Sequence, residues 1–445
     1  MIKKFLNIAI CLVLLASTEV RAQQDTCRVA LMVPLYLEQV DQEFWNAEPS
    51  NKMLSTKPFS FLHFYEGFMI AADSITSSRN MKLELKVYDV DNTVSKADSA
   101  ILDPWLATVD LIVGPFYLKP FNVLKQFAFD NNIPIVNPIT QHSDIVDNQP
   151  NMIKVKPSMK SQLVQLDSLI RRQYHNNNVF IIRQDRYTDT AMVNRIKQIA
   201  ERNIDSCTYV DNQSIVNTIR KHQKRWDYLN IKYEATEYLT DSVILNVDSL
   251  GRCIDDTTVF LNRVISVNYK RDSLHTVMDY ASTMRNNLII VYGTDKVFSK
   301  EIVNKVTKLI ENYPITVIML PEWSKFDGLF NENLMKMHAI YFDDKFLDCQ
   351  NIKVQSFICK FRNRYETEPT DYAYQGFDIG WYFLNALRIY GEYMIDYLPY
   401  FDIPLLQTRF NFQRNDDYSG YENTFWNIYQ FKGYNRVVLT TGYEN

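Results

Sequence analysis

The stretch that most constrains the fold is 110–140, because it has the pattern of two buried strands around a helix. Residues 111–113 form a short apolar run, which is typical of a strand buried on both faces. Apolar residues then recur at helical spacing over 120–130, and a second apolar run covers 133–136. Short turns join these segments, so they predict a βαβ unit and hence a parallel sheet with a right-handed crossover.

The same alternation of strands and helices extends over most of the 445 residues. Before the central stretch it predicts strands at 28–36 and 83–88 and helices at 59–76 and 95–107. After it, the pattern predicts strands at 152–155, 179–183, 288–292, 315–320 and 338–342, with helices at 157–174, 190–202, 272–284, 300–312, 354–365 and 375–390. Short strands at 408–413 and 426–431 follow, joined by a turn-rich segment. These two sets predict an α/β protein of two doubly wound parallel-sheet lobes, joined by a hinge that the chain crosses several times.

The expected domain boundaries follow from this pattern. We expect a signal peptide at 1–22, the first part of lobe 1 at 27–155, lobe 2 at 156–341, the second part of lobe 1 at 342–395, and a tail at 396–445 that returns toward lobe 2. The polar region at about 207–270 shows no clear periodicity, so we interpret it as an insertion in lobe 2 with some helix and strand.

The first residues have the pattern of an export signal. Lys3 and Lys4 supply positive charge, 5–16 are largely apolar, and Val20-Arg21-Ala22 fits a cleavage site. A single anchor helix is the competing interpretation, but this apolar run is too short to span a bilayer well. No later segment has the pattern of a membrane span. We therefore expect a periplasmic protein, exported and cleaved after Ala22.

Cysteine usage is compatible with an oxidising compartment but fixes no disulfide. The cysteine predicted to leave with the signal peptide is Cys11, and the others are Cys27, Cys207, Cys253, Cys349 and Cys359. An oxidising compartment permits disulfides among these five, yet spacing alone cannot pair them. The sequence contains no C-x-x-C motif, which argues against a redox pair or a zinc ribbon.

Composition and motifs argue against nucleic-acid binding and against catalysis. The formal net charge is −4, so the chain lacks the excess of basic residues that is typical of nucleic-acid-binding proteins. The six histidines are scattered, and neither a G-x-S-x-G elbow, a P-loop nor a G-x-G-x-x-G turn occurs. We expect no enzyme activity and no cofactor.

Two acidic clusters offer alternative cation sites. Asp89-x-Asp91-Asn92 lacks the glycine and the downstream glutamate of a calcium loop, so a strand-end turn is the preferred interpretation. Asp343 and Asp344 with Asp348 could hold a cation, although a solvated hinge loop is favoured. We therefore expect no metal site.

Aromatic and polar residues recur where the predicted strands end. In open α/β sheets, ligands bind beyond the carboxyl ends of the strands. An aromatic-lined hollow with a few polar groups is typical of a small-ligand site. The candidate ligand-binding residues are Tyr36, Phe116, Tyr117, Thr140, Tyr187, Thr294, Glu322 and Trp323.

Several segments carry a resemblance to a known family. They are RVALMVPL, FYEGFMIAADSI, LELKVYDVDNT, VDLIVGP, NNIPIVNPIT, PNMIKVKPS and FRNRYETEPTDYAYQGFDIGWYFLNAL. From Val29 to about Gly391 the chain resembles the type I periplasmic binding proteins, of the branched-chain amino-acid-binding class. LPEWSKFD and LLQTRFNFQR further resemble a Bacteroidetes subgroup often fused to a LysM module. We expect no LysM here, because the family region starts close to the predicted cleavage site.

The resemblance implies a non-catalytic protein that captures a small ligand in a cleft between the lobes and works with a membrane permease. The ligand class it implies is amino acid-, peptide- or muropeptide-like. In the family's amino-acid binders, small hydroxyl residues follow the Gly-Pro turn, whereas this chain has Phe116, Tyr117 and Leu118 there. Glu322 resembles the family's acidic contact to an amino group. The alternative is a protein-interaction module that regulates cell-wall synthesis or envelope assembly, and an enzyme is a distant third.

Overall fold

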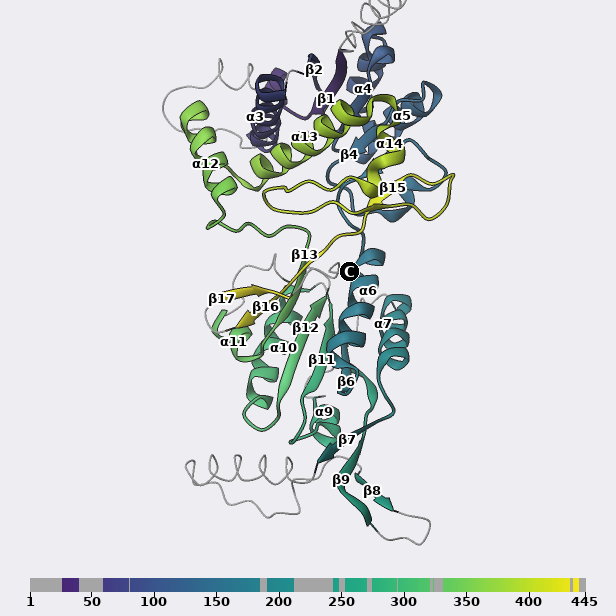
Figure 1. Ribbon diagram of the computed structural model, residues 1–445, viewed down its shortest axis with the longest axis vertical. Coiled ribbons are helices and arrows are strands. Elements are labelled where there is room, and N and C mark those ends of the chain that lie inside the picture. The colour runs from purple at the N-terminus through teal and green to yellow at the C-terminus, as the bar shows by residue number, and fades with distance from the viewer. Residues whose placement is uncertain are drawn as a thin grey trace, which may run out of the picture. The chain divides into compact units, whose positions relative to one another are not determined.

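The chain divides into two compact units. The computed structural model describes residues 26–39, 59–79, 81–184, 190–211, 243–247, 253–269, 274–293, 295–320, 323, 331–432 and 435–439. Unit 1 contains the residues up to Pro157 together with Phe346–Phe425, and unit 2 contains Ser158–Lys345 with the residues from Trp426 onward. The chain therefore passes between the units three times, after Pro157, Lys345 and Phe425 (Figure 1).

Unit 1 is built on a seven-stranded sheet with the order β14-β15-β5-β4-β3-β1-β2. Its strands are β1 (Cys27–Val33), β2 (Leu83–Asp89), β3 (Leu111–Val113), β4 (Ile135–Asn137), β5 (Met152–Lys154), β14 (Phe412–Gln413) and β15 (Tyr421–Asn423). All neighbours pair in parallel except β14, which runs antiparallel to β15. Since β1 lies between β2 and β3, the strand order reverses at β1, and this reversal is the switch point of a doubly wound sheet.

Helices cover both faces of the unit 1 sheet. They are α3 (Leu62–Arg79), α4 (Val94–Ile101), α5 (Leu118–Asp130), α12 (Ile352–Tyr365), α13 (Asp371–Tyr390) and α14 (Met394–Tyr397). On one face, Phe68 of α3 and Phe383 of α13 belong to the same buried cluster as Val29 of β1. On the other face, Leu124 of α5 packs with Ile112 of β3. The unit is therefore a three-layer sandwich whose core is the parallel sheet.

Two glycines let α3 and α13 approach closely. A Cβ atom at Gly67 would lie 1.9 Å from the carbonyl oxygen of Ala373, and one at Gly376 would lie 2.0 Å from that of Phe64. Real Cβ atoms do not come this near to backbone, so each helix presents a glycine where the other helix crosses it. This crossing fixes α13 against α3 on one face of the sheet.

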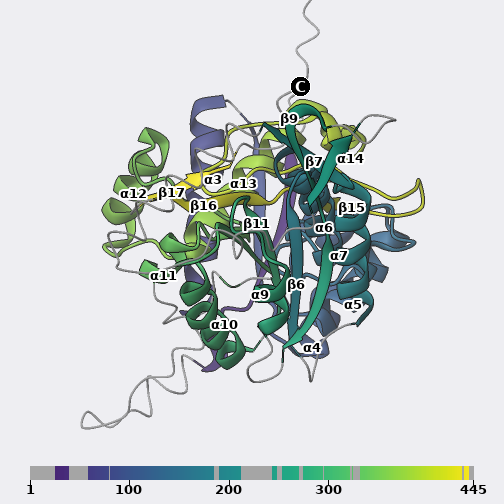
Figure 2. The same cartoon turned by 90° about the horizontal axis from the view of Figure 1, so that it is seen from below.

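Unit 2 repeats the architecture around a sheet of order β10-β6-β11-β12-β13-β16-β17. The strands are β6 (Asn178–Gln184), β10 (Val264–Tyr269), β11 (Asn287–Tyr292), β12 (Ile315–Leu320), β13 (Ile340–Asp343), β16 (Asn427–Lys432) and β17 (Asn435–Val438). Its helices are α6 (Met159–Leu169), α7 (Thr190–Asn203), α9 (His275–Tyr280), α10 (Lys296–Leu309) and α11 (Asn331–Lys336). Figure 2 shows α9 and α10 on one side of β6 and β11, with α6 and α7 on the other.

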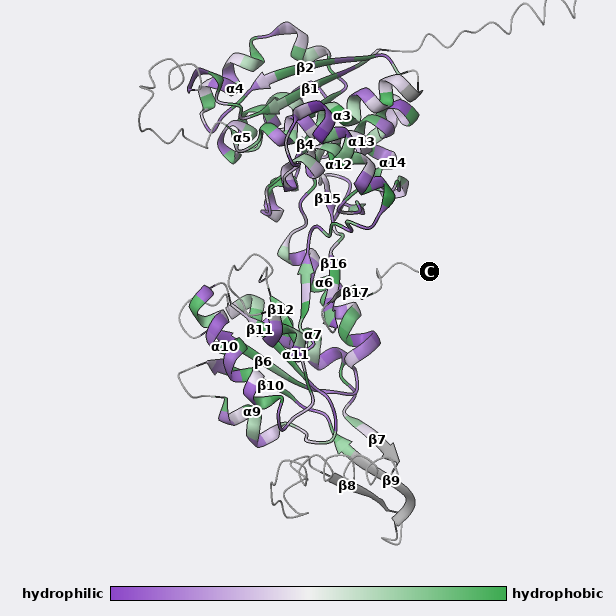
Figure 3. Cartoon of the chain, turned by 90° about the vertical axis from the view of Figure 1, so that its left-hand side faces the viewer, coloured by the Kyte–Doolittle hydropathy of each residue, from purple (hydrophilic) through white to green (hydrophobic). Residues whose placement is uncertain are grey.

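Burial in both units follows the parallel strands. Every residue of β11 and β12 is buried, in agreement with the continuous apolar runs from which these strands were predicted. Figure 3 shows hydrophobic colouring along the strands of the sheets, whereas α7 and α10 also carry hydrophilic residues. The predicted α/β class with two mostly parallel sheets is confirmed. No helix within the described ranges is long and apolar enough to cross a membrane.

The structure corrects three details of the sequence prediction. The expected helix 95–107 ends at Ile101, because Pro104 begins a separate 3₁₀ helix, Pro104–Thr108, with Asp103 accepting a hydrogen bond from Trp105 N. The expected helix 272–284 is shorter, since α9 covers only His275–Tyr280. The expected strand 408–413 is reduced to β14, and the turn-rich segment after it contains β15.

The described strands of the region 207–270, expected to be an insertion, belong to two different sheets. β7 (Cys207–Asp211), β8 (Val243–Val247) and β9 (Cys253–Leu261) form a separate antiparallel sheet of order β7-β9-β8. β10 instead belongs to the main sheet, where it pairs in parallel with β6. β10 lies at the edge of the sheet, and only Val267 and Tyr269 in it are buried. Its exposed positions hold polar residues, so the sequence shows no continuous apolar run that would predict a strand.

Candidate functional site

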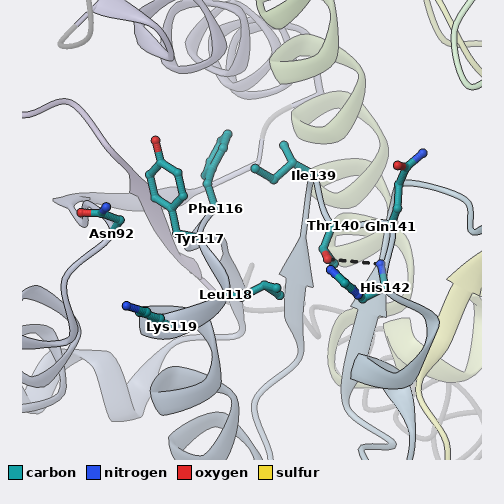
Figure 4. Close-up of a pocket in the computed structure, with 9 residues that line it drawn as sticks. All are labelled: Asn92, Phe116, Tyr117, Leu118, Lys119, Ile139, Thr140, Gln141 and His142. Carbon is teal, nitrogen blue, oxygen red and sulfur yellow. Dashed lines mark hydrogen bonds between the residues drawn. The ribbon is translucent and has the colours of Figure 1, made fainter. Parts of the chain in front are cut away.

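A hollow of about 480 Å³ opens at the carboxyl ends of the unit 1 strands (Figure 4). Its apolar lining comes from Phe116, Tyr117, Leu118 and Ile139. Its polar lining comes from Asn92, Lys119, Thr140, Gln141 and His142. These residues follow β2, β3 and β4, beside the switch point, and the volume is within the range of small-ligand sites.

The turn after β3 sets the apolar wall. Gly114 has a φ of 97°, and a Cβ atom there would lie 2.2 Å from the carbonyl oxygen of Met32, so the turn requires glycine. The chain that leaves this turn directs the Phe116 ring into the core, where it packs edge-on against Phe61 and Phe64 at centroid distances of 4.8 and 4.7 Å. Phe116 is consequently anchored from behind while one edge of it lines the hollow.

Tyr117 is held from the end of β1. The Tyr36 hydroxyl donates a hydrogen bond of 3.0 Å to the Tyr117 hydroxyl. Tyr36 has a φ of 52°, and the backbone N–H groups of Leu35, Tyr36 and Leu37 all donate to the Asp89 carboxylate, at 2.8–3.0 Å. The carboxylate of β2 thus fixes the turn after β1, and the turn places the Tyr36 phenol against Tyr117.

The acidic segment after β2 is a strand-end turn, as its sequence indicated. While Asp89 binds the turn after β1, Asp91 accepts hydrogen bonds from the backbone N–H and the hydroxyl of Thr93. The residues that the structure describes contain no group of three or more His, Cys, Asp or Glu side chains that could hold a metal ion.

The turn after β4 supplies the opposite wall. The buried Asn137 side chain accepts hydrogen bonds from the backbone N–H groups of Ile139 and Thr140, at 3.1 and 2.8 Å. The Thr140 hydroxyl in turn accepts the backbone N–H of His142 at 3.4 Å (Figure 4). Asn137 therefore shapes the loop that brings Thr140 and His142 to the hollow.

The charge that the lining carries is positive. Lys119 lies in the first turn of α5, where unpaired backbone N–H groups add a partial positive charge. The lining residues include no carboxylate. The hollow therefore combines an apolar wall with a basic helix start, an arrangement that suits an apolar ligand with a negative group.

The structure brings together four of the predicted site residues. Phe116, Tyr117 and Thr140 line the hollow, and Tyr36 lies behind Tyr117. Sequence reasoning missed the other six lining residues, although all of them flank predicted strand ends.

The remaining predicted residues belong to unit 2. Tyr187, Thr294 and Glu322 lie outside the described residues. Trp323 is in the core of its unit with 1 % of its surface exposed, and its indole N–H donates to the carbonyl oxygen of Gly293 at 2.8 Å. Its ring also packs edge-on against Phe298. Its packing and this hydrogen bond give Trp323 a structural role in the core of unit 2.

Comparison with known proteins defines the fold. No protein-family model matches the sequence, and no curated protein matches it significantly. A solved structure from Rhodospirillum rubrum, named for a branched-chain amino acid ABC transporter, is similar with a TM-score of 0.58 and 10% identity, covering 93% of this chain and 100% of that chain. A branched-chain amino acid ABC transporter periplasmic ligand-binding protein from Burkholderia xenovorans LB400 is similar with a TM-score of 0.50 and 9% identity, covering 93% and 95%. The chain therefore has the fold of the type I periplasmic binding proteins.

Proposed function

We propose that the protein is a non-catalytic solute-binding protein that captures a small ligand at the carboxyl ends of β2, β3 and β4. The observation that carries this proposal is the hollow of about 480 Å³ at the switch point of the unit 1 sheet. In doubly wound sheets this position gathers the ends of several strands, and ligands bind there whatever their chemistry. The solved relatives that are named for transport of amino acids support the same class of function.

The lining indicates the chemistry of the ligand. Leu118 and Ile139 offer an apolar surface beside the Tyr117 ring, and Lys119 at the start of α5 offers a positive charge. We propose an amino acid-, peptide- or muropeptide-like ligand whose carboxylate faces Lys119 and whose apolar part lies against Tyr117 and Ile139. Charge-assisted hydrogen bonds from an ammonium and backbone N–H groups would orient the carboxylate.

Thermal unfolding in the presence of amino acids, short peptides, sugars and muropeptides tests the proposal. A ligand that binds only the native state raises its stability by about 2.7 kcal/mol at 100 times Kd, so the midpoint rises saturably. Lys119→Glu reverses the charge at the hollow and should abolish the rise. Lys125→Glu is the matched control on the same helix, because Lys125 is outside the lining.

The result decides between two classes of function. A saturable rise with one ligand class, lost in Lys119→Glu and kept in Lys125→Glu, supports the solute-binding proposal. A flat response across all the compounds overturns it and favours a protein-interaction module in its place. A rise that survives Lys119→Glu refutes the proposed site while leaving solute binding intact.

The location and the transport partner belong to the same proposal. We propose that the chain is exported to the periplasm, is cleaved after Ala22 and delivers its ligand to a membrane permease. Amino-terminal sequencing of the exported protein should begin at Gln23, and an intact amino terminus would contradict this. Crosslinking in ligand-loaded cells should recover a permease, and recovery of cell-wall enzymes alone would exclude it.

A further inference from the structure

A second hollow of about 430 Å³ lies on unit 1, between α12, α13 and the segment 403–406. It shares no lining residue with the hollow at the strand ends. Its volume is also within the range of small-molecule sites. It is a separate feature of unit 1, and the solute-binding proposal does not explain it.

The α12 side of this hollow exposes an apolar residue, two lysines and a serine. Ile352, Ser356 and Lys360 follow each other at intervals of four residues, so they form one stripe of the helix. Lys353 lies beside this stripe. All four side chains are exposed, and 79% of the Ile352 surface is accessible.

The α13 side of the hollow is aromatic. The rings of Phe377 and Trp381 are nearly parallel, with an interplanar angle of 9° and a centroid distance of 5.8 Å. Phe357 of α12 supports Phe377 from the side at 5.0 Å. Phe377 and Trp381 are only half-buried, so an aromatic face is left for a ligand to cover.

The polar groups of the lining differ in how far other groups of the protein already bind them. The Ser74 hydroxyl and the Asn385 amide both donate to carbonyl oxygens of their own helices, at 2.7 Å. The ammonium groups of Lys353 and Lys360 form no ion pair with any carboxylate that the structure describes. The lining contains no Asp or Glu, so the charge it carries is positive and lies beside apolar side chains.

We propose that this hollow binds a small organic anion with a flat, apolar body, of the class of aromatic carboxylates. The body would lie on Phe377 and Trp381 and against Ile352, and the carboxylate would face the two ammonium groups. The charge pattern distinguishes this occupant from a neutral apolar ligand, which would gain nothing from the lysines, and from a cation, which they would repel. The volume of the hollow matches an aromatic body of one ring or of two fused rings.

Calorimetric titration of the purified protein with 2-naphthoate and its neutral analogue 2-naphthamide tests this. We expect 2-naphthoate to bind saturably at one site with a Kd of about 1 mM or tighter, the range open to a ligand of about a dozen heavy atoms. We expect 2-naphthamide to bind about tenfold more weakly, because it lacks the charge. Raising the salt concentration should weaken only the binding of 2-naphthoate.

Variants locate the site. Lys353→Glu combined with Lys360→Glu should weaken 2-naphthoate binding by about tenfold or more. The matched control is Lys82→Glu, an exposed lysine on the same unit that is outside the lining and should leave the affinity unchanged. Ser356→Trp should block the hollow, and an unchanged thermal midpoint will show that this exposed position tolerates the change. Lys119→Glu, which tests the strand-end site, should leave 2-naphthoate binding intact.

Three results would overturn the inference. They are equal affinity for the acid and the amide, an affinity unaffected by the double lysine variant, or no saturable heat up to about 5 mM ligand. Loss of 2-naphthoate binding in Lys119→Glu but not in the double lysine variant would assign the anion to the strand-end hollow instead.

Discussion

The hydroxyl oxygens of Tyr36 and Tyr117 lie 3.0 Å apart, and their hydrogen bond joins the turn after β1 to the start of α5. Burial, reinforced by this bond to Tyr117, raises the pKa of Tyr36, so Tyr36 stays protonated and continues to donate at physiological pH. Tyr36 is buried, with 3% of its surface exposed, whereas Tyr117 is half-buried and lines the hollow. The two ends of the bond are therefore in different environments.

This asymmetry predicts unequal costs for the two Tyr→Phe changes. Tyr117→Phe removes the acceptor of a buried donor and should lower the free energy of unfolding by about 1–3 kcal/mol, whereas Tyr36→Phe leaves a hydroxyl that water can reach and should cost about 1 kcal/mol. Urea unfolding measures both. The double variant should cost less than Tyr117→Phe, because it also removes the buried Tyr36 hydroxyl. A larger cost for Tyr36→Phe than for Tyr117→Phe would contradict this.

The glycine crossing of α3 and α13 gives a second prediction. In an exposed helix, Gly→Ala stabilises by about 1 kcal/mol. At Gly67 and Gly376 the added Cβ would meet backbone carbonyl oxygen at 1.9 and 2.0 Å, so the helices must move apart. Gly67→Ala and Gly376→Ala should each lower the free energy of unfolding by about 2 kcal/mol or more. Ser77→Ala, an exposed position on α3, is the control and should be nearly neutral.

Chemical denaturation of these variants decides whether the crossing is as close as the structure has it. A stabilising Gly67→Ala would mean that α3 and α13 have room for a methyl group between them. A cost at Gly67 without one at Gly376 would mean that the approach is close on one side alone.

Buried apolar runs made most of the fold predictable. The run 111–113 and the helical pattern over 120–130 correspond to β3 and α5, and the other continuous apolar runs correspond to the central strands of both sheets. β10 was missed because a strand at the edge of a sheet is only partly buried, and its polar residues break the apolar run. β15 was missed because it is three residues long and contains Glu422 and Asn423, so it has no apolar run. The resemblance to the subgroup stays a prediction.

The site was predictable only in part, for a different physical reason. Parallel strands end at a common edge, so strand-end positions alone bring Phe116, Tyr117 and Thr140 together. Strand ends do not show whether a side chain points outward or into the core, and Trp323 packs into the core of unit 2. Lys119, in the first turn of α5, and His142, in the loop after β4, were missed because the sequence there does not tell a lining residue from a solvated one.

A buried ion pair at the tail gives a third prediction. The side chain of Lys154 in β5 is fully buried, and its ammonium donates to the carbonyl oxygen of Lys156 at 2.6 Å and to Glu422 of β15 at 3.2 Å. Burial lowers the pKa of Lys154, and the Glu422 carboxylate opposes this. Glu422→Gln should lower the free energy of unfolding by about 3 kcal/mol, because it leaves a buried ammonium without its carboxylate.

An exposed pair in the same unit is the control. Arg409 and Asp402 form an ion pair whose side chains are 40% and 54% exposed. Asp402→Asn should change the free energy of unfolding by less than about 1 kcal/mol, because solvent screens the pair. Lys154→Met combined with Glu422→Leu should recover much of the loss from Glu422→Gln. Equal effects of Glu422→Gln and Asp402→Asn would show that the ammonium is not desolvated.

Asp378 of α13 predicts how stability depends on pH. Its carboxylate is buried, with 1% of the residue exposed, and accepts the backbone N–H groups of Leu406 and Gln407 at 2.6 and 3.0 Å, which ties the segment 403–407 to α13. Burial raises the pKa of Asp378 to about 7, and the two N–H donors only partly offset this. The ordinary pKa of the group is 3.8. Between these values the folded protein holds a proton that the unfolded chain has lost.

The free energy of unfolding should therefore fall as pH rises from about 4 to about 7, by at most about 1.4 kcal/mol per pH unit from this one proton. Asp378→Asn carries no titrating group and should remove this part of the slope, whereas Asp402→Asn, at an exposed carboxylate, should keep it. Urea unfolding of the three proteins at several pH values measures the slopes. If Asp378→Asn and the unaltered protein lose stability in parallel over this range, the Asp378 carboxyl is ionised in the folded protein well below pH 7, and the two N–H donors outweigh its burial.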